Sequence, residues 1–222
     1  MWDDGIMKFA QMMGTGILES LYMTLFSSLI AYVIGLPLGV LLVVTDKDGI
    51  APLVWFNKVI GVIVNLIRSV PFVILLISVM PLTRAIIGTT LGSTAVVIPL
   101  IIASAPYIAR LVESSLKEVD KGVIEAAQSM GATPFQIIFK VLIPEAMPSL
   151  IIGSAIAVTT ILSYSAMSGF VGGGGLGDIA IRYGYYRYET GTMLVTVAIL
   201  VLIVQVFQEL GTMWMKRSDK RL

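Results

Sequence analysis

The sequence predicts an all-α integral membrane protein with five transmembrane helices. Of its 222 residues, 57% are hydrophobic and 13% are charged, whereas a soluble domain carries about a quarter charged residues. The mean hydropathy of +0.93 also indicates a membrane protein. A helix that crosses about 30 Å of hydrocarbon needs about 20 apolar residues. Five stretches meet this requirement: residues 18–44, 58–80, 94–112, 147–170 and 192–210.

The composition argues against several classes of function. The chain contains no cysteine and no histidine, so it lacks disulfides, thiolate and imidazole metal ligands, and the usual proton shuttle. Its net charge of +1 does not favour nucleic acid as a partner. The sequence also lacks the G-x-x-x-x-G-K-[ST] loop that binds nucleotide triphosphates. We therefore expect no enzyme activity and no catalytic, cofactor-binding or metal-binding residue in this chain.

Residues 1–17 precede the first predicted span. They contain two aspartates and a single lysine, unlike the basic start of a signal peptide. Apolar residues recur there at i, i+3, i+4 and i+7, which predicts a short helix; these are Ile6, Phe9, Ala10 and Met13. Such a stripe fits a helix lying at the membrane interface, or a face packed against the rest of the protein.

The first two predicted spans each contain a proline that should disturb the helix. In the span 18–44, Pro37 should bend the helix because proline lacks a backbone N–H donor. In the span 58–80, Pro71 follows three residues after Arg68. A buried arginine costs roughly 2.5–3.5 kcal/mol on insertion scales. Arg68 is therefore either a functional intramembrane charge or a side chain that reaches back to the headgroups.

The last three spans differ in character. We expect a short turn over residues 81–93, and then an irregular helix over 94–112 because that stretch contains two prolines. The span 147–170 is rich in small and hydroxylated residues, which let membrane helices approach closely. We expect this helix to lie inside, against a partner helix or a pathway. The span 192–210 consists mainly of Val, Leu and Ile and should face lipid.

The distribution of lysine and arginine predicts the orientation of the chain. Five spans place the two termini on opposite sides of the membrane, and cytoplasmic loops carry the excess of basic residues. With the N-terminus outside and the C-terminus cytoplasmic, ten basic residues lie inside and four outside, Arg68 uncounted. The inner group is Lys47, Lys58, Arg110, Lys117, Lys121, Lys140, Lys216, Arg217, Lys220 and Arg221, and the outer group is Lys8, Arg84, Arg182 and Arg187.

A glycine run, GGGGLG from Gly172 to Gly177, formally matches the pattern G-x-G-x-x-G. A dinucleotide fingerprint requires a preceding strand in a βαβ unit. Here the run follows a membrane span and lies on the predicted outer side. We therefore interpret it as a flexible or tightly turned outer loop.

Residues 125–144, EAAQSMGATPFQIIFKVLIP, form a less apolar segment on the predicted cytoplasmic side. Gly131 fits a left-handed C-terminal helix cap, Thr133 fits the next N-cap, and Pro134 fits the first turn of a new helix. The segment is therefore predicted to be two short helices joined by a tight corner. A rigid knob of this kind between membrane spans predicts a socket on another protein.

The same segment resembles the signature of permease subunits of bacterial ABC importers. That signature reads E-A-A, three residues, G, nine residues, then I-x-L-P. This chain has Val141 and Ile143 where the pattern has Ile and Leu, both substitutions within the same class. Further stretches resemble the methionine importer permease family: GLPLGVLLVVT at 35–45, RSVPFVILL at 68–76, APYIARLVESSL at 105–116 and YSAMSGFVGGGGLG at 164–177.

The resemblance implies a type I ABC importer permease of the bacterial inner membrane. It implies a homodimer with two cytoplasmic ATPase subunits, which hold ATP and Mg, and an extracytoplasmic solute-binding protein or lipoprotein. The transmembrane domain would cover residues 17–210, with a cytoplasmic coupling loop at 118–146 and a basic tail at 211–222. The residues implied to contact the ATPase are Glu125, Ala126, Ala127, Gly131, Ala132, Pro134 and Pro144.

By the same resemblance, Met167 narrows a transport pathway along the dimer axis, together with Tyr164 and Ser165. Methionine suits an irregular constriction because its side chain is flexible, although ordinary helix packing explains it as well. Composition and spacing do not identify methionine as the substrate, so another amino acid or an osmoprotectant stays open. A secondary transporter without an ATPase is disfavoured because such folds commonly show internal repeats and ionisable midplane sites.

Overall fold

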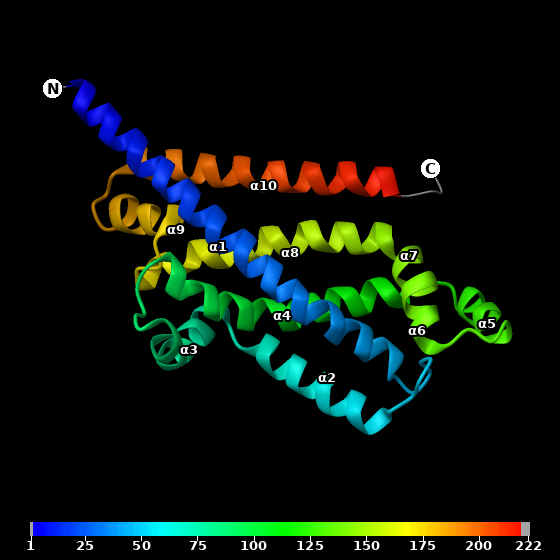
Figure 1. Ribbon diagram of the computed structural model, residues 1–222. Coiled ribbons are helices and arrows are strands. Elements are labelled where there is room, and N and C mark those ends of the chain that lie inside the picture. Colours follow the sequence, from blue (N-terminus) through cyan, green and yellow to red (C-terminus); the bar gives the residue numbers. More distant parts are fainter. Residues whose placement is uncertain (1, 219–222) are drawn as a thin grey trace. The chain divides into compact units, whose positions relative to one another are not determined.

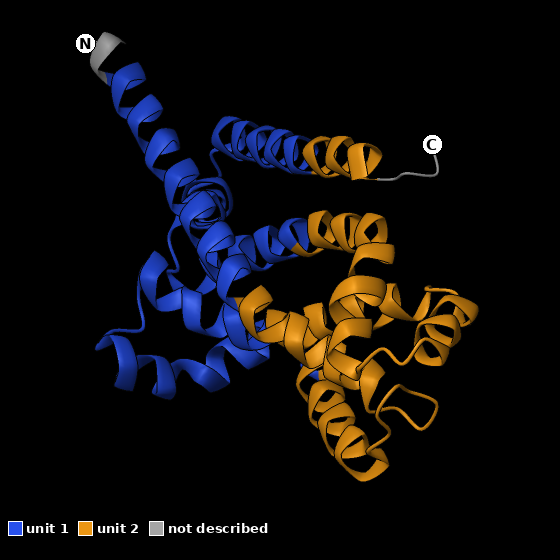
Figure 2. Cartoon of the chain, turned by 45° about the vertical axis from the view of Figure 1, so that its right-hand side comes forward, with its two compact units in different colours: residues 1–30, 70–103, 158–207 blue, residues 31–69, 104–157, 208–222 orange. Residues whose placement is uncertain are grey.

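The computed structural model describes residues 2–218, and these residues form helices and connecting turns without strands. The chain separates into two compact units (Figure 2), one made of residues 1–30, 70–103 and 158–207 and the other of residues 31–69, 104–157 and 208–222. We call them unit 1 and unit 2. The four longest helices each contribute residues to both units, whereas α2 belongs to unit 2 and α3 to unit 1.

Four of the five predicted spans are present as single helical stretches (Figure 1). Four helical stretches of the described chain are long and apolar enough to cross a membrane, namely residues 5–44, 93–117, 147–171 and 190–218. They correspond to α1 (Trp2–Val44), α4 (Ser93–Lys117), α8 (Met147–Met167) with the 3₁₀ turn η2 (Ser168–Val171), and α10 (Thr190–Ser218). A fifth span is obtained if the bent pair α2 (Val54–Ser69) and α3 (Phe72–Ile87) counts as one.

Helix α1 corrects one expectation about the N-terminal region. It runs without interruption from Trp2 to Val44, so residues 1–17 do not form a separate short helix. The apolar stripe found there is mixed, because Met13 is buried in a small core with Leu176 and Ile179 while Ile6 is exposed. Residues of the same apolar stripe therefore lie partly in the core of unit 1 and partly on its exposed surface.

The glycines that flank Pro37 allow α1 to lie close to α4 in unit 2. A Cβ atom on Gly35 would lie 2.7 Å from the carbonyl oxygen of Ala105, and one on Gly39 would lie 2.6 Å from that of Ala109. Real Cβ atoms essentially never approach other atoms so closely. These two positions therefore require glycine.

The second predicted span is broken rather than continuous. Helix α2 ends at Ser69 and α3 begins at Phe72, because Pro71 has an extended backbone (ψ 136°) and proline disfavours helical geometry in the residue before it. The turn predicted to begin at residue 81 is wrong in its position. Pro81 lies inside α3, which ends at Ile87 and is capped by Gly88 (φ +85°), and the turn follows that glycine.

The remaining elements of unit 1 are short. Helix α9 (Gly175–Ile179) and the π-helix η3 (Ala180–Tyr185) connect the end of α8 to α10. The four long helices are buried to very different degrees. In an apolar stretch of 18 residues from each helix, 61% of the residues are buried in α4, 44% in α1, 28% in α8 and 11% in α10. Within one chain, α4 rather than the small-residue helix α8 is the best-covered span.

Candidate coupling site

The segment predicted to dock on another protein forms four short helical pieces in unit 2, between the end of α4 and the start of α8 (Figure 1). We call residues 121–145 the coupling segment. It consists of α5 (Lys121–Ser129), α6 (Pro134–Ile137), the π-helix η1 (Ile138–Leu142) and α7 (Ile143–Glu145). Asp120 caps α5, since its side chain accepts a hydrogen bond from the Gly122 N–H at 2.6 Å.

The corner after α5 is a Schellman motif, in which a left-handed residue satisfies the last carbonyls of a helix. Gly131 has φ +80°. Its N–H donates to the Gln128 carbonyl at 2.9 Å, and the Ala132 N–H donates to the Ala127 carbonyl at 3.1 Å. The left-handed cap predicted at Gly131 is confirmed.

The restart after the corner is a capping box. The Thr133 hydroxyl accepts from the Gln136 N–H at 3.4 Å, and the Thr133 N–H donates to the Gln136 side-chain oxygen at 2.9 Å. Pro134 occupies the first helical turn, where its missing N–H costs nothing. Both helix ends at the corner are therefore satisfied by local bonds, which makes the segment rigid.

Pro144 is accommodated by a wider helical turn. A proline inside a helix removes one hydrogen bond and clashes with the carbonyl four residues earlier. Here the preceding residues form η1, and the Ile143 N–H donates to the Ile138 carbonyl, five residues back. The helical course continues through Pro144 to Glu145, and Ala146 separates it from α8.

The coupling segment exposes an apolar surface with one carboxylate from the signature motif. Glu125 and Ala126 are exposed, whereas Ala127 is buried against the segment's own core. Of the other predicted contact residues, Gly131, Pro134 and Pro144 are exposed and Ala132 is half-buried. Large apolar side chains nearby in the sequence are also exposed, namely Met130, Phe135 and Phe139. The centroids of the two phenylalanine rings are 4.4 Å apart.

A cavity of about 370 Å³ lies beside α5 in unit 2. Its walls come from the loop after α1, the end of α4, α5 and Leu142 of η1. Buried Leu116 and Leu142 provide apolar lining, and charged groups from three elements also line it: Asp46, Asp48, Lys117, Lys121 and Glu125. The loop after α1 and the coupling helix α5 are therefore neighbours.

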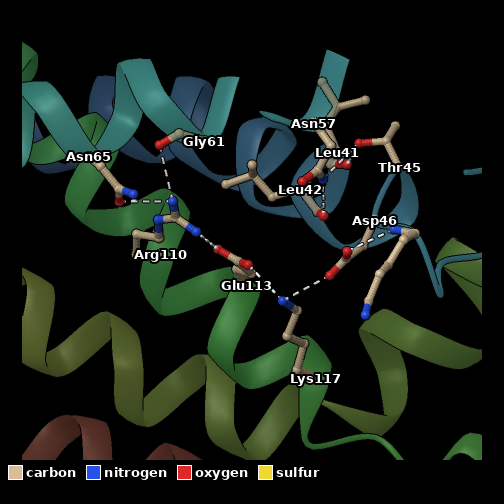
Figure 3. A network of polar contacts seen from close by, with 11 residues as sticks. Leu41, Leu42, Thr45, Asp46, Asn57, Gly61, Asn65, Arg110, Glu113 and Lys117 are labelled. Carbon is tan, nitrogen blue, oxygen red and sulfur yellow. Dashed lines mark hydrogen bonds and ion pairs between the residues drawn. The ribbon is translucent and has the colours of Figure 1, made fainter. Parts of the chain in front are cut away.

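A chain of charged side chains begins at this cavity and extends along α4 (Figure 3). The Lys117 ammonium pairs with Asp46 at 3.2 Å and with Glu113 at 2.8 Å. Glu113 also pairs with Arg110. The Arg110 guanidinium donates to α2 through the Asn65 side chain at 2.8 Å and the Gly61 carbonyl at 3.2 Å.

This network was not anticipated from the sequence. Arg110, Glu113 and Lys117 are spaced i, i+3 and i+7 on one face of α4, which is a detectable signal for helix ion pairs. Asp46 and Asn65 come from distant segments, so no local pattern links them to α4. In the orientation prediction, Arg110 and Lys117 were counted only as positive charges.

The ion pair shifts the titration of Asp46. The Lys117 ammonium, which hydrogen-bonds the carboxylate, lowers the pKa of Asp46 below its ordinary value of 3.8. The backbone N–H of Lys47 donates to the other carboxylate oxygen at 2.8 Å and acts in the same direction. Asp46 therefore stays ionised at neutral pH.

The three predicted pathway residues lie on the last turn of α8 but differ in how far they are buried. Tyr164 is half-buried and its ring stacks on Phe72 with centroids 4.6 Å apart. Ser165 is buried and donates to the Leu162 carbonyl, whereas Met167 is 43% exposed. Within one chain, Met167 is thus the pathway residue free to contact a second molecule.

Arg68 lies in the last turn of α2, directly before the break at Pro71, and its side chain is exposed. The structure gives its position at the end of a helix. The choice between a functional charge and a side chain that reaches the headgroups stays a prediction.

The glycine run is a tight turn held by α1 in unit 1. Gly172, Gly174 and Gly175 all have φ near +75°. The Glu19 carboxylate accepts from the Gly175 N–H at 2.6 Å, and the Ser20 hydroxyl accepts from the Leu176 N–H at 2.9 Å. Of the two predicted alternatives, the tight turn is the one observed, and Glu19 and Ser20 are hydrogen-bond partners of the turn that sequence patterns did not reveal.

Comparisons with known proteins agree with this architecture. Residues 35–222 match the family model described as binding-protein-dependent transport system inner membrane component. The chain is 48% identical over 207 residues to the probable D-methionine transport system permease protein MetI of Vibrio cholerae, covering 93% of this chain and 92% of that one. It is 47% identical to the D-methionine transport system permease protein MetI of Escherichia coli K12, covering 69% of this chain and 71% of that one.

Solved structures show the same similarity. An inward-facing conformation of the MetNI methionine ABC transporter superposes with a TM-score of 0.93 at 43% identity, covering 95% of this chain and 98% of that one. An amino acid ABC transporter crystallised with histidines shares the fold with a TM-score of 0.79 at 22% identity, covering 96% of this chain and 97% of that one. The chain therefore belongs to the family of binding-protein-dependent transport system inner membrane components.

Proposed function

We propose that the protein is the membrane-spanning permease subunit of an ATP-driven methionine importer. The observation that carries this proposal is the coupling segment, whose two helix ends are capped by local bonds and which exposes three large apolar side chains, Met130, Phe135 and Phe139. A surface of this kind is suited to a groove on another protein. The names of the similar proteins, D-methionine permeases and a methionine ABC transporter, support the choice of substrate.

The ATPase would contact the exposed part of the coupling segment. Exposed Met130, Phe135 and Phe139 provide apolar area, and aromatic residues and methionine are enriched in interface cores. Glu125 adds one exposed carboxylate that can pair with a basic side chain of the ATPase. ATP and Mg would be held by that partner.

A second copy of the chain would complete the transport pathway. Helix α8 carries small residues along its length, yet 28% of its most apolar window is buried within one chain. Small residues favour close packing between membrane helices. We propose that α8 faces the second copy, with Met167 near the dimer axis. An extracytoplasmic solute-binding protein would deliver the substrate on the opposite side from the ATPase.

The experiment that tests the proposal is co-purification followed by transport. The protein is expressed with a candidate ATPase subunit, purified through a tag on this chain, and reconstituted in liposomes with a candidate solute-binding protein. Uptake of radiolabelled L-methionine is measured with an excess of D-methionine, other amino acids or an osmoprotectant as competitor. The proposal is supported if only methionine competes with the radiolabelled L-methionine. Inhibition of uptake by another amino acid or an osmoprotectant would mean that methionine is not the specific substrate.

The secondary-transporter alternative has a direct control. Vesicles that contain this chain without the ATPase should show no uphill uptake, because the proposed source of energy is ATP hydrolysis on that missing subunit. Uphill uptake driven by an ion gradient in those vesicles would contradict the proposed dependence on ATP.

A further inference from the structure

We infer that Asp46, Lys117, Glu113 and Arg110 are positioning residues that make the loop after α1 and helix α2 move together with the coupling segment. The inference rests on the proposed function, since it concerns how a movement of the ATPase reaches the membrane helices. The chain itself joins the coupling segment to α4 and α8. The ion-pair network adds a non-covalent connection to two further elements.

The loop after α1 is held firmly enough to transmit a displacement. The Ala51 N–H donates to the Val44 carbonyl and the Leu53 N–H to the Thr45 carbonyl, both at 3.0 Å. Asn57 at the start of α2 donates to the Leu42 carbonyl at 2.6 Å. The loop is therefore bonded to the end of α1 and to α2, and a force on Asp46 acts on both.

Glu113 is the branch point of the network. Its side chain is 12% exposed and pairs with cations on both sides, Arg110 toward α2 and Lys117 toward the loop. Removing either partner of a buried ion pair leaves an uncompensated charge. We therefore expect substitutions of Glu113 or Arg110 to damage folding as well as coupling.

The Asp46–Lys117 ion pair is the interaction of the network that can be removed while the protein still folds. The side chains of Asp46 and Lys117 are 35% and 48% exposed, so water can solvate whichever partner remains. Lys117 also keeps its bond to Glu113 after Asp46 is neutralised. Asp46→Asn therefore separates the loop from α4 with little effect on the rest of the network.

The same loop offers a matched control. Asp48 lies two residues away, also lines the cavity, and is 70% exposed. Its ion pair is with neighbouring Lys47 at 3.8 Å, which adds no connection between elements. Asp48→Asn removes the same charge from the same loop and leaves the network intact.

The test compares both variants in the complete complex in liposomes, with ATP hydrolysis and methionine uptake measured on the same preparation. Changes along contiguous networks alter coupling by roughly twofold to thirtyfold. We expect Asp46→Asn to raise the ATP consumed per methionine by a factor in this range, while Asp48→Asn stays at the wild-type value. Asp46→Glu, which keeps the charge, should restore part of the coupling.

Equal ATP consumption per methionine in Asp46→Asn, Asp48→Asn and wild type would overturn the inference. A merely structural role predicts a different pattern, in which Asp46→Asn changes only thermal stability and complex yield, while the ATP consumed per methionine stays at the wild-type value.

A distance measurement gives a second test. The chain has no native cysteine, so spin labels can be placed on Ile50→Cys and Ile124→Cys, which line the cavity from the loop and from α5. In the wild-type background, the distance should stay constant between the nucleotide-free and ATP-bound complexes. In Asp46→Asn it should broaden or change with nucleotide, and an unchanged narrow distance would contradict the inference.

The two proposals fail in distinguishable ways. If charge reversal at Glu125 leaves ATP-driven uptake unchanged, the coupling function itself is wrong. If Glu125→Lys abolishes uptake and Asp46→Asn does not alter the coupling ratio, the coupling segment acts without the ion-pair network.

Discussion

Asp46 is a partly exposed carboxylate that connects the loop after α1 to helix α4 through its ion pair with Lys117. Its pKa is lowered chiefly by the hydrogen bond from Lys117, so the folded state favours the ionised form. A lowered pKa contributes stability above the unfolded-state value of 3.8, and this contribution disappears as the pH falls through the folded-state value.

We therefore predict that Asp46→Asn unfolds at a lower temperature than wild type at neutral pH. The difference between the two should shrink once the pH falls below about 3.8, the ordinary value, because the wild-type carboxyl then also becomes neutral. Thermal unfolding in detergent over a pH series measures this. A difference that persists undiminished in acid would show that the ion pair is not its source.

Gly177 illustrates a different residue-scale constraint. A Cβ atom there would collide with the backbone of Ala166 at the end of α8. Gly177→Ala should therefore lower the free energy of unfolding by about 1–3 kcal/mol, as overpacking does. Gly191→Ala is the matched control, because a Cβ at that position meets nothing within 4 Å. Thermal stability of the two purified variants measures the difference, and equal stability would contradict the close packing.

At the scale of the element, the coupling segment depends on its caps. Thr133→Ala removes the capping box, which is worth about 1 kcal/mol and should make local opening of α6 roughly fivefold more frequent. Hydrogen exchange of the backbone amides of residues 135–142 measures this opening. Ser129→Ala is the control, since its hydroxyl bonds only within α5. Equal exchange in both variants would mean that the capping box does not stabilise the segment.

The coupling segment was predictable because its signals are local. Gly131, Thr133 and Pro134 each specify backbone geometry within one turn. The continuous helix α1 and the inclusion of Pro81 in α3 were not predicted, because tertiary packing and neighbouring turns override weak local signals. The ion-pair network was missed for the same reason, since Asp46 and Lys117 are distant in sequence and only the fold brings them together.

At the scale of the whole molecule, the proposed orientation has a simple test. Single cysteines replace Asp48 in the loop after α1, whose side chain is 70% exposed, and Tyr188 before α10, which is 86% exposed. In intact cells, a membrane-impermeant maleimide should label Tyr188→Cys and spare Asp48→Cys until the inner membrane is permeabilised. The opposite labelling pattern would invert the proposed topology.

Burial within the whole chain also explains why α8 could not be placed from its composition. Small residues identify a helix that packs closely, but they do not say against which molecule. Helix α4 is the best-covered span inside the chain, and α10 is the least covered. The proposed second copy and the lipid account for the surfaces that remain open.

The central claim is that ATP hydrolysis on a partner reaches this permease through the coupling segment. The most direct measurement is ATP-driven methionine uptake by Glu125→Lys in the reconstituted complex, with Glu118→Lys as control, since both glutamates are exposed and belong to unit 2. We predict that Glu125→Lys inserts and purifies normally but loses ATP-coupled uptake, while Glu118→Lys transports like wild type. Wild-type uptake by Glu125→Lys would contradict the claim.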